Sequence, residues 1–113
     1  MNTKAVVKRL MDCAEDDWLA LWMIAQKVEE ELGIEDPMAN LEVTLQLVRE
    51  LLKRGLRAGD SPVANTGVHF RAWPNQDPEV IVDLIRREWT QRGALPSWGD
   101  GPWFAAERER KLA

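Results

Sequence analysis

Few residues of this chain have the types and spacing that catalysis or metal binding requires. Glu88 is the most discordant of them, because helical spacing places its carboxylate among apolar neighbours such as Trp89. A carboxylate that faces a protein core needs a partner, and an indole N–H, Arg71 or His69 could serve. The sequence places no second carboxylate and no nucleophile beside Glu88. We therefore predict a structural role for Glu88 and Trp89 rather than a catalytic one.

The chain has a single cysteine and a single histidine, which excludes most sites built from these residue types. Cys13 cannot form an intramolecular disulfide or a cysteine-based zinc site, and His69 cannot form a histidine cluster. A thiol–imidazole pair between them has no flanking signature, so Cys13 is interpreted as a helix-end thiol and His69 as a strand residue beside the core. The sequence also lacks a phosphate-binding glycine loop, a paired-histidine motif and a nucleophile elbow. It predicts a protein that is not an enzyme and needs no metal or cofactor.

The charge of the chain is unevenly distributed. Its 15 basic and 19 acidic residues give a formal net charge of −4, and residues 1–35 alone hold four basic and eight acidic residues. An acidic surface favours basic partners, whereas a nucleic-acid binder usually carries a basic stripe. The candidate partner-binding residues are Glu15, Asp16, Asp17, Glu29, Glu30 and Glu35. The alternative that these are ordinary solvated residues near helix ends remains open.

Six of the 113 residues are tryptophan, which is a high count. Trp98 and Trp103 lie in a tail that is rich in glycine and proline. Burial of such a side chain contributes about 1.5–3 kcal/mol, which is enough to order a short tail. We predict that Trp103 and Phe104 have a structural role, folding back over the helices and covering Trp22. The functional alternative is an exposed aromatic interface or a small-ligand pocket.

Apolar periodicity and capping residues predict four helices and a β-hairpin. The predicted elements are a helix from Thr3 to Cys13, a short extended segment at Trp18 and Leu19, a helix from Leu21 to Leu32, a helix from a capping Asn40 to Arg54, strands at residues 56–58 and 68–73, and a helix from a capping Asp77 to Gln91. The acidic segment from Asp12 to Asp17 is predicted to interrupt the chain after the first helix. Asp36-Pro37 is interpreted as a turn.

This order of elements is typical of a winged helix, with the hairpin as the wing. The predicted fold class is therefore α+β, mainly helical and winged-helix-like, with an irregular tryptophan-rich C-terminal tail. A plain helical bundle carrying a hairpin fits nearly as well. At 113 residues the chain predicts a single domain with a compact body over residues 3–92, a tail over 93–106 packed on it, and frayed residues 107–113.

The helix from Asn40 to Arg54 would be the DNA reader of a winged helix. Its outward face is predicted to carry Glu42, Gln46, Arg49 and Lys53. A reading helix presents basic or amide side chains from its N-terminal part, and Glu42 occupies that part here. The loop over residues 59–67 also lacks lysine and arginine. Nucleic acid is therefore not an expected partner, and a DNA-binding regulator is an alternative hypothesis, as is a small-ligand sensor with a tryptophan-lined pocket.

Two groups of residues resemble the signature of a known family. The first is the run from Arg49 to Asp60, and the second, which is more specific, is Glu88-Trp89, Gly93, Pro96, Gly99-Asp100 and Trp103-Phe104. Together they resemble a family of small, single-domain, uncharacterised proteins of bacteria, chiefly actinobacteria, over about residues 16–106. The resemblance implies a fold and a bacterial origin without an established activity. Some members are encoded near toxin genes, which implies an immunity-type partner.

These observations favour a non-enzymatic protein-interaction module that binds a basic protein through an acidic surface, as an immunity-type neutraliser would. A homodimer is a further possibility, because Met23 and Leu47 are apolar and fall outside the predicted core stripes. No apolar run approaches the length of a membrane helix, and residues 1–7 lack the apolar core of a secretory signal. The expected location is therefore the cytoplasm, without a membrane partner.

Overall fold

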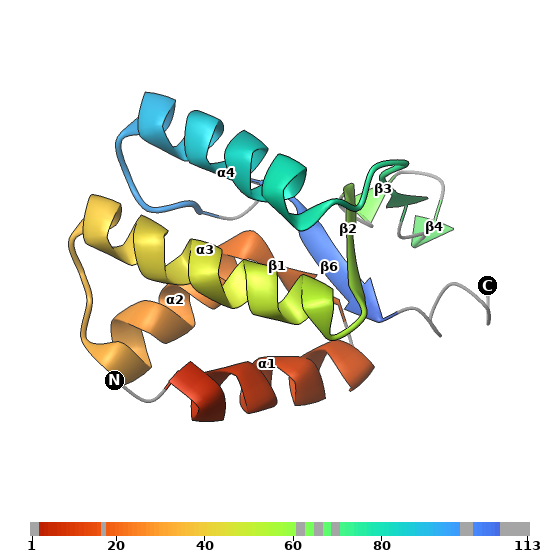
Figure 1. Cartoon of the computed structure of the whole chain (residues 1–113), viewed down its shortest axis with the longest axis horizontal. Helices are drawn as coiled ribbons and strands as arrows, with labels where there is room; N and C mark the ends of the chain where they lie inside the picture. Colours follow the sequence, from red (N-terminus) through yellow and green to blue (C-terminus); the bar gives the residue numbers. More distant parts are fainter. Residues whose placement is uncertain are drawn as a thin grey trace.

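The computed structural model describes residues 3–16, 18–60, 63–64, 67–68, 71–97 and 101–106. These residues form, in order, α1 (Thr3–Asp16), β1 (Leu19–Ala20), α2 (Leu21–Leu32), α3 (Pro37–Lys53), β2 (Leu56–Asp60), β3 (Val63–Ala64), β4 (Gly67–Val68), β5 (Arg71–Ala72), α4 (Pro78–Arg92) and β6 (Trp103–Ala106). Figure 1 shows α3 lying between α1 and α4. The fold class is α+β and mainly helical, as predicted. Residues 107–113, which were predicted to fray, lie outside the described residues.

Helices α2 and α4 match the predicted ranges closely, but α3 begins earlier than predicted. Its N-cap is Asp36, whose Oδ2 accepts a hydrogen bond of 2.9 Å from the backbone N–H of Ala39, and Pro37 opens the helix. The predicted cap, Asn40, instead lies inside the helix and is fully buried. The prediction was wrong because Asp-Pro is a helix start as well as a turn signal. Asp77-Pro78 begins α4 in the same way.

Helix α1 is also longer than predicted, because it continues through the acidic segment to Asp16. Val7, Leu10 and Ala14 are buried and repeat at helical spacing across this segment. Asp12 and Glu15 are exposed on the opposite side. Acidic residues on the solvent side of a helix do not interrupt it when its apolar stripe continues.

The tail that was predicted to be irregular supplies a central strand of the sheet. Among the described strands the order is β1-β6-β2-β5, and β6 is antiparallel to both β1 and β2. The first strand of the hairpin, β2, therefore pairs with β6 as well as with β5, and the pairing with β6 was not part of the prediction. For this reason the structure does not confirm the winged-helix arrangement.

The hairpin itself is present and longer than predicted. Strands β2 and β5 pair at its base through Gly59 and Ala72, and β3 pairs with β4 beyond them. Beyond these pairs, the side chain of Gln76 forms hydrogen bonds with the β2 backbone such as a neighbouring strand would form. Its Oε1 accepts from the Ala58 N–H, and its Nε2 donates to the carbonyl oxygens of Ala58 and Trp73, each at 2.8 Å. Gln76 therefore bonds the backbone N–H and C=O groups of Ala58 on the side of β2 where the pairing with β5 ends.

Phe104 of β6 joins the sheet to the helical core. It lies in register between Leu19 of β1 and Ala58 of β2, and all three side chains are at most 1% exposed. The small Ala58 leaves room for the phenyl ring on the face that packs against the helices. The predicted structural role of Phe104 is consistent with this burial.

The segment that leads into β6 also completes the start of α2. The residue before α2 is Ala20, whose side chain cannot accept a hydrogen bond. The Leu21 N–H donates instead to the Pro102 carbonyl at 3.1 Å. Gly101 has a φ of +77°, and a Cβ atom at this position would lie 2.4 Å from Leu21 Cδ2 and 3.2 Å from Leu21 Cβ. The close approach that caps α2 therefore requires a glycine.

We predict that Gly101→Ala destabilises the protein more than Gly93→Ala does. Gly93 has nearly the same φ, +73°, but a Cβ there would meet no atom within 4 Å. Both variants carry the cost of a left-handed alanine, about 1–2 kcal/mol, and Gly101→Ala adds an overpacking cost of about 1–3 kcal/mol. Urea unfolding of both variants measures the difference. Equal losses would show that the contact between Gly101 and Leu21 does not constrain the fold.

Candidate functional site

The acidic residues predicted to bind a partner do not form one surface. Glu15 lies in the last turn of α1, and the side chain of Asp16 and the whole of Asp17 lie outside the described residues. Glu29 and Glu30 lie in the last turn of α2. Figure 1 shows the end of α2 and the start of α3 on the opposite side of the molecule from the end of α1. The structure thus divides the predicted site into two groups.

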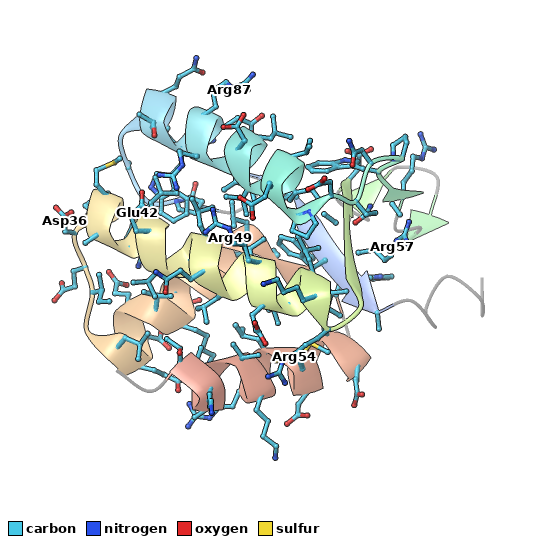
Figure 2. The ribbon with its side chains drawn as sticks, viewed as in Figure 1. Asp36, Glu42, Arg49, Arg54, Arg57 and Arg87 are labelled. Carbon is cyan, nitrogen blue, oxygen red and sulfur yellow. The ribbon has the colours of Figure 1, made fainter. Side chains whose placement is uncertain are left out.

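The larger group belongs to the connection between two helices, residues 29–38, which we call the α2–α3 corner. Its acidic residues are Glu29, Glu30, Glu31, Glu35 and Asp36. Glu30, Glu35 and Asp36 are exposed, whereas Glu29 and Glu31 are half-buried. Figure 2 shows Asp36 at the outer end of α3. This corner is the densest group of acidic side chains that the structure describes.

Most of the carboxylates at the corner have no basic partner among the described residues. Glu31 is the exception, because it forms salt bridges with Arg9 of α1 and with Lys27, the latter at 3.6 Å. Glu30 accepts a hydrogen bond of 3.0 Å from the uncharged Gln26 amide. No basic side chain of the described residues forms a salt bridge with Glu29, Glu30 or Glu35. The charges of Glu30 and Glu35 are therefore exposed to solvent without an ion pair to this part of the chain, and Glu29 is half-buried without one.

The placement of these charges is unfavourable for the helix itself. Glu29, Glu30 and Glu31 occupy the last turn of α2, which contains no basic residue. The C-terminal end of a helix carries a partial negative charge, so a carboxylate there costs about 0.3–1 kcal/mol relative to a favourable charge. The corner therefore departs from the charge arrangement that folding alone favours.

The backbone of the corner is fixed at both ends. Gly33 ends α2 with a φ of +71°, and its N–H donates to the Glu29 carbonyl at 3.1 Å. Asp36 begins α3 by capping the Ala39 N–H. A glycine in the left-handed conformation and an aspartate cap, three residues apart, define the change of direction between the helices.

Asn40 connects the corner to the core. Its Nδ2 donates to the carbonyl oxygens of Ala25 at 3.1 Å and Ile34 at 3.0 Å, and its Oδ1 accepts from Thr44 Oγ1 at 2.8 Å. Asn40 and Thr44 are fully buried. One side chain of α3 therefore holds both α2 and the connection that carries Ile34 and Glu35. The prediction of Asn40 as a helix cap missed this role.

An apolar side chain is exposed in the same segment as the acidic residues. Of the large apolar side chains that the structure describes, Met38 and Val80 are the exposed ones, at 44% and 50%. Met38 lies in the first turn of α3, two residues after Asp36. Methionine is adaptable in shape and is common at binding surfaces that accept varied partners. The corner thus combines unpaired carboxylates with an apolar side chain, which sequence periodicity alone did not identify.

The predicted outward face of α3 lies beside α4. The Arg49 guanidinium forms two hydrogen bonds with Glu79, at 2.8 and 3.2 Å, and Arg86 of α4 bonds to both carboxylate oxygens of Glu42. Figure 2 shows Glu42 and Arg49 on the side of α3 that faces α4. The hydrogen bond from Arg86 lowers the pKa of Glu42, and that from Arg49 lowers the pKa of Glu79. Two of the four residues of this face are therefore bonded to a neighbouring helix.

Glu88 does not face the core, so this prediction was wrong. The buried residues of α4 are Ile81, Val82, Ile85 and Trp89, whereas Glu88 is exposed. At 100° per residue, Glu88 lies about 70° from the centre of this stripe, and its long side chain reaches solvent. Its carboxylate needs no buried partner.

The aromatic residues contribute mainly to the interior. Trp89 is 1% exposed and Phe104 is fully buried, whereas Trp103 is half-buried within β6. The predicted cover over Trp22 is not established, although Trp22 is half-buried and its indole nitrogen is enclosed. Trp98 lies outside the described residues. Two clefts flank α3, one towards α1 and one towards α4, and none of the described tryptophans lines either of them.

The other residues considered for chemistry or assembly contribute little here. Cys13 is exposed, and His69 lies outside the described residues, so a pair between them cannot be placed. Leu47 is 1% exposed and Met23 is half-buried against the core, so the structure removes Leu47 as a dimer contact. Within the part of the chain that is described, no three His, Cys, Asp or Glu side chains are grouped to hold a metal ion.

We predict that Asn40→Ala lowers the free energy of unfolding by about 1–3 kcal/mol, because one buried and one partly buried carbonyl group lose a hydrogen-bond donor. The matched control is Gln46→Ala, which removes an exposed amide from the same helix and should change stability by less than about 0.5 kcal/mol. Urea unfolding compares the two. Similar values for both variants would mean that Asn40 does not hold the corner.

We also predict that the ion pairs between α3 and α4 stabilise the protein above about pH 4.5 and that this contribution is lost in acid. The pKa of Glu42 is lowered on folding, so its stabilisation is fully present above the unfolded pKa and disappears as the pH falls through the folded one. Glu42→Gln should therefore lose less stability between pH 5 and pH 3 than the unmodified chain, measured by urea unfolding. Glu88→Gln, which removes an exposed carboxylate without an ion pair to the described residues, should show the unmodified chain's pH dependence.

No protein-family model matches the chain, and neither a curated protein nor a solved structure matches it. Among the described helices, none has the length and apolar character needed to cross a bilayer. The resemblance to an actinobacterial family therefore stays a prediction, and the evidence on function is the geometry of the α2–α3 corner.

Proposed function

We propose that this chain is a non-enzymatic protein-interaction module and that its α2–α3 corner binds a basic protein partner. The observation that carries the proposal is that one ten-residue segment holds the exposed Met38 and three glutamates, Glu29, Glu30 and Glu35, that form no salt bridge with the described residues. An interface needs both an apolar contact that excludes water and charges that select the partner. The corner supplies both within ten consecutive residues.

The chemistry of the corner defines the partner. A segment with lysine or arginine side chains around an apolar residue would pair with the carboxylates and cover Met38. Charge complementarity of this kind raises the association rate above a neutral 10⁵–10⁶ M⁻¹s⁻¹ and makes it depend on salt. An immunity-type role, which the family resemblance implies, would use the same contacts to neutralise a basic toxin.

The unfavourable charge placement in α2 supports the proposal. Acidic residues at a helix C-terminus reduce folding stability, and departures from local folding rules are concentrated at functional sites. A binding role gives a physical reason for Glu29 and Glu30 in the last turn, since the same charges would be favourable next to a cationic partner.

The alternatives have less support. For DNA binding, α3 would have to enter a groove, but it lies between α1 and α4, and Glu42 and Arg49 are bonded to α4. The two clefts described beside α3 have no described tryptophan in their lining, so they do not support a ligand sensor with a tryptophan-lined pocket. The cytoplasm remains the proposed location, because the exposed Cys13 thiol is compatible with a reducing compartment.

The test uses a probe of defined chemistry, an amphipathic helical peptide with lysines on one side and leucines on the other. We expect the unmodified chain to bind it, and Glu29→Lys/Glu30→Lys to weaken binding at least tenfold at low salt. The double reversal should not harm the fold, because lysines at the end of α2 improve its dipole interaction by about 0.3–1 kcal/mol each. Fluorescence anisotropy measures binding, and urea unfolding measures stability.

Two variants complete the design. Glu15→Lys reverses a charge at the far end of α1, so it should bind the peptide as the unmodified chain does. Met38→Ser should weaken binding while leaving its salt dependence unchanged, because it removes the apolar contact and no charge. The proposal fails if the double reversal at residues 29 and 30 binds with the affinity of the unmodified chain, or if Glu15→Lys weakens binding equally.

A further inference from the structure

A second feature lies on the other side of α3 and shares no residue with the α2–α3 corner. It is a half-open cleft of about 310 Å³ between α1 and α3, lined by Thr3, Lys4, Val7, Gln46, Leu47, Glu50 and Arg54. Figure 2 shows Arg54 on the side of α3 that faces α1. The volume is at the lower end of the range of small-molecule sites, about 300–1,000 Å³.

The floor of the cleft is apolar and closed. Val7 of α1 and Leu47 of α3 line it, and their side chains are 3% and 1% exposed. The leucine was expected to point outward as a dimer contact, but it lies at the bottom of this cleft instead. A small apolar chain that entered the cleft would remove its own surface from water, whereas Val7 and Leu47 are already almost fully buried.

The rim of the cleft has an excess of positive charge and hydrogen-bond donors. Lys4 is exposed, and no carboxylate of the described residues forms a salt bridge with it. Glu50 is the acidic residue of the lining, and its Oε1 already accepts from Arg54 Nε at 3.1 Å. The other N–H groups of the Arg54 guanidinium are not used by that bond. A carboxylate fits this arrangement because it accepts several hydrogen bonds at once.

We infer that this cleft binds a small monocarboxylate with a short aliphatic chain. The carboxylate contacts Lys4 and the terminal nitrogens of Arg54, and the aliphatic chain lies on Val7 and Leu47. The small volume and the presence of Glu50 disfavour ligands with several negative charges. The inference is independent of the proposed partner-binding function, since it concerns different side chains.

The test titrates hexanoate into the isotopically labelled full chain and follows backbone amide signals by NMR. We expect saturable shifts at Val7 and Leu47 and weaker binding of butanoate, by up to about fourfold for each methylene removed. Hexylamine has the same apolar chain and the opposite charge, so it should not produce these shifts. The inference is overturned if hexanoate gives no saturable shift at Val7 and Leu47, or if hexylamine binds equally well.

Variants of opposite expected effect separate this site from general attraction to a charged surface. Lys4→Met should weaken hexanoate binding at least fivefold. Glu50→Gln should tighten it, because it removes the negative charge of the lining and frees Arg54. Lys53→Met is the matched control, since Lys53 is an exposed cation of α3 that does not line the cleft. An equal loss in Lys4→Met and Lys53→Met, or weaker binding by Glu50→Gln, would contradict the inference.

Discussion

Strand β6 inserts between β1 and β2, and the positions of the other elements depend on that insertion. It brings Phe104 into the core between Leu19 and Ala58, and it connects β1, which is two residues long, to the rest of the sheet. The segment just before β6 caps the start of α2 through the Pro102 carbonyl. A strand near the end of the chain therefore fixes elements near its beginning, so the fold requires nearly the whole chain.

Helix α3 connects the core to the α2–α3 corner at the surface. It contacts α1, α2, α4 and β2, and the buried Asn40 attaches its first turns to α2 and to Ile34. The two ion pairs with α4 lie two helical turns apart on each helix, which fixes how the antiparallel helices align. The α2–α3 corner thus presents its carboxylates from a rigid support. The exposed charges lower local stability, whereas the hydrogen bonds beneath them preserve the geometry that binding would need.

The sequence was sufficient to predict the local elements and less informative about their pairing. The apolar stripe and Gly33 correctly delimited α2, and Asp77-Pro78 correctly began α4. The equivalent Asp36-Pro37 was interpreted as a turn, although the same capping chemistry was available to identify it. Strand β6 was missed because the four residues after Gly101-Pro102 are too few to show a periodicity, and a central strand is defined by partners distant in sequence. For the candidate site, acidic residue types were evident, but their separation into two groups depends on the directions of α1 and α2, which no local pattern contains.

The most direct test of the role of β6 is residue-resolved amide hydrogen exchange on the full chain, compared with the free energy of global unfolding in urea. If β6 holds the fold together, the slowest amides of β6 and β2 exchange only through global unfolding and report the same free energy as the urea measurement. Exchange of β6 at a much lower free energy, with the amides of α3 still protected, would show that the strand detaches while the helices remain folded. That result would contradict the dependence of the fold on its C-terminal strand.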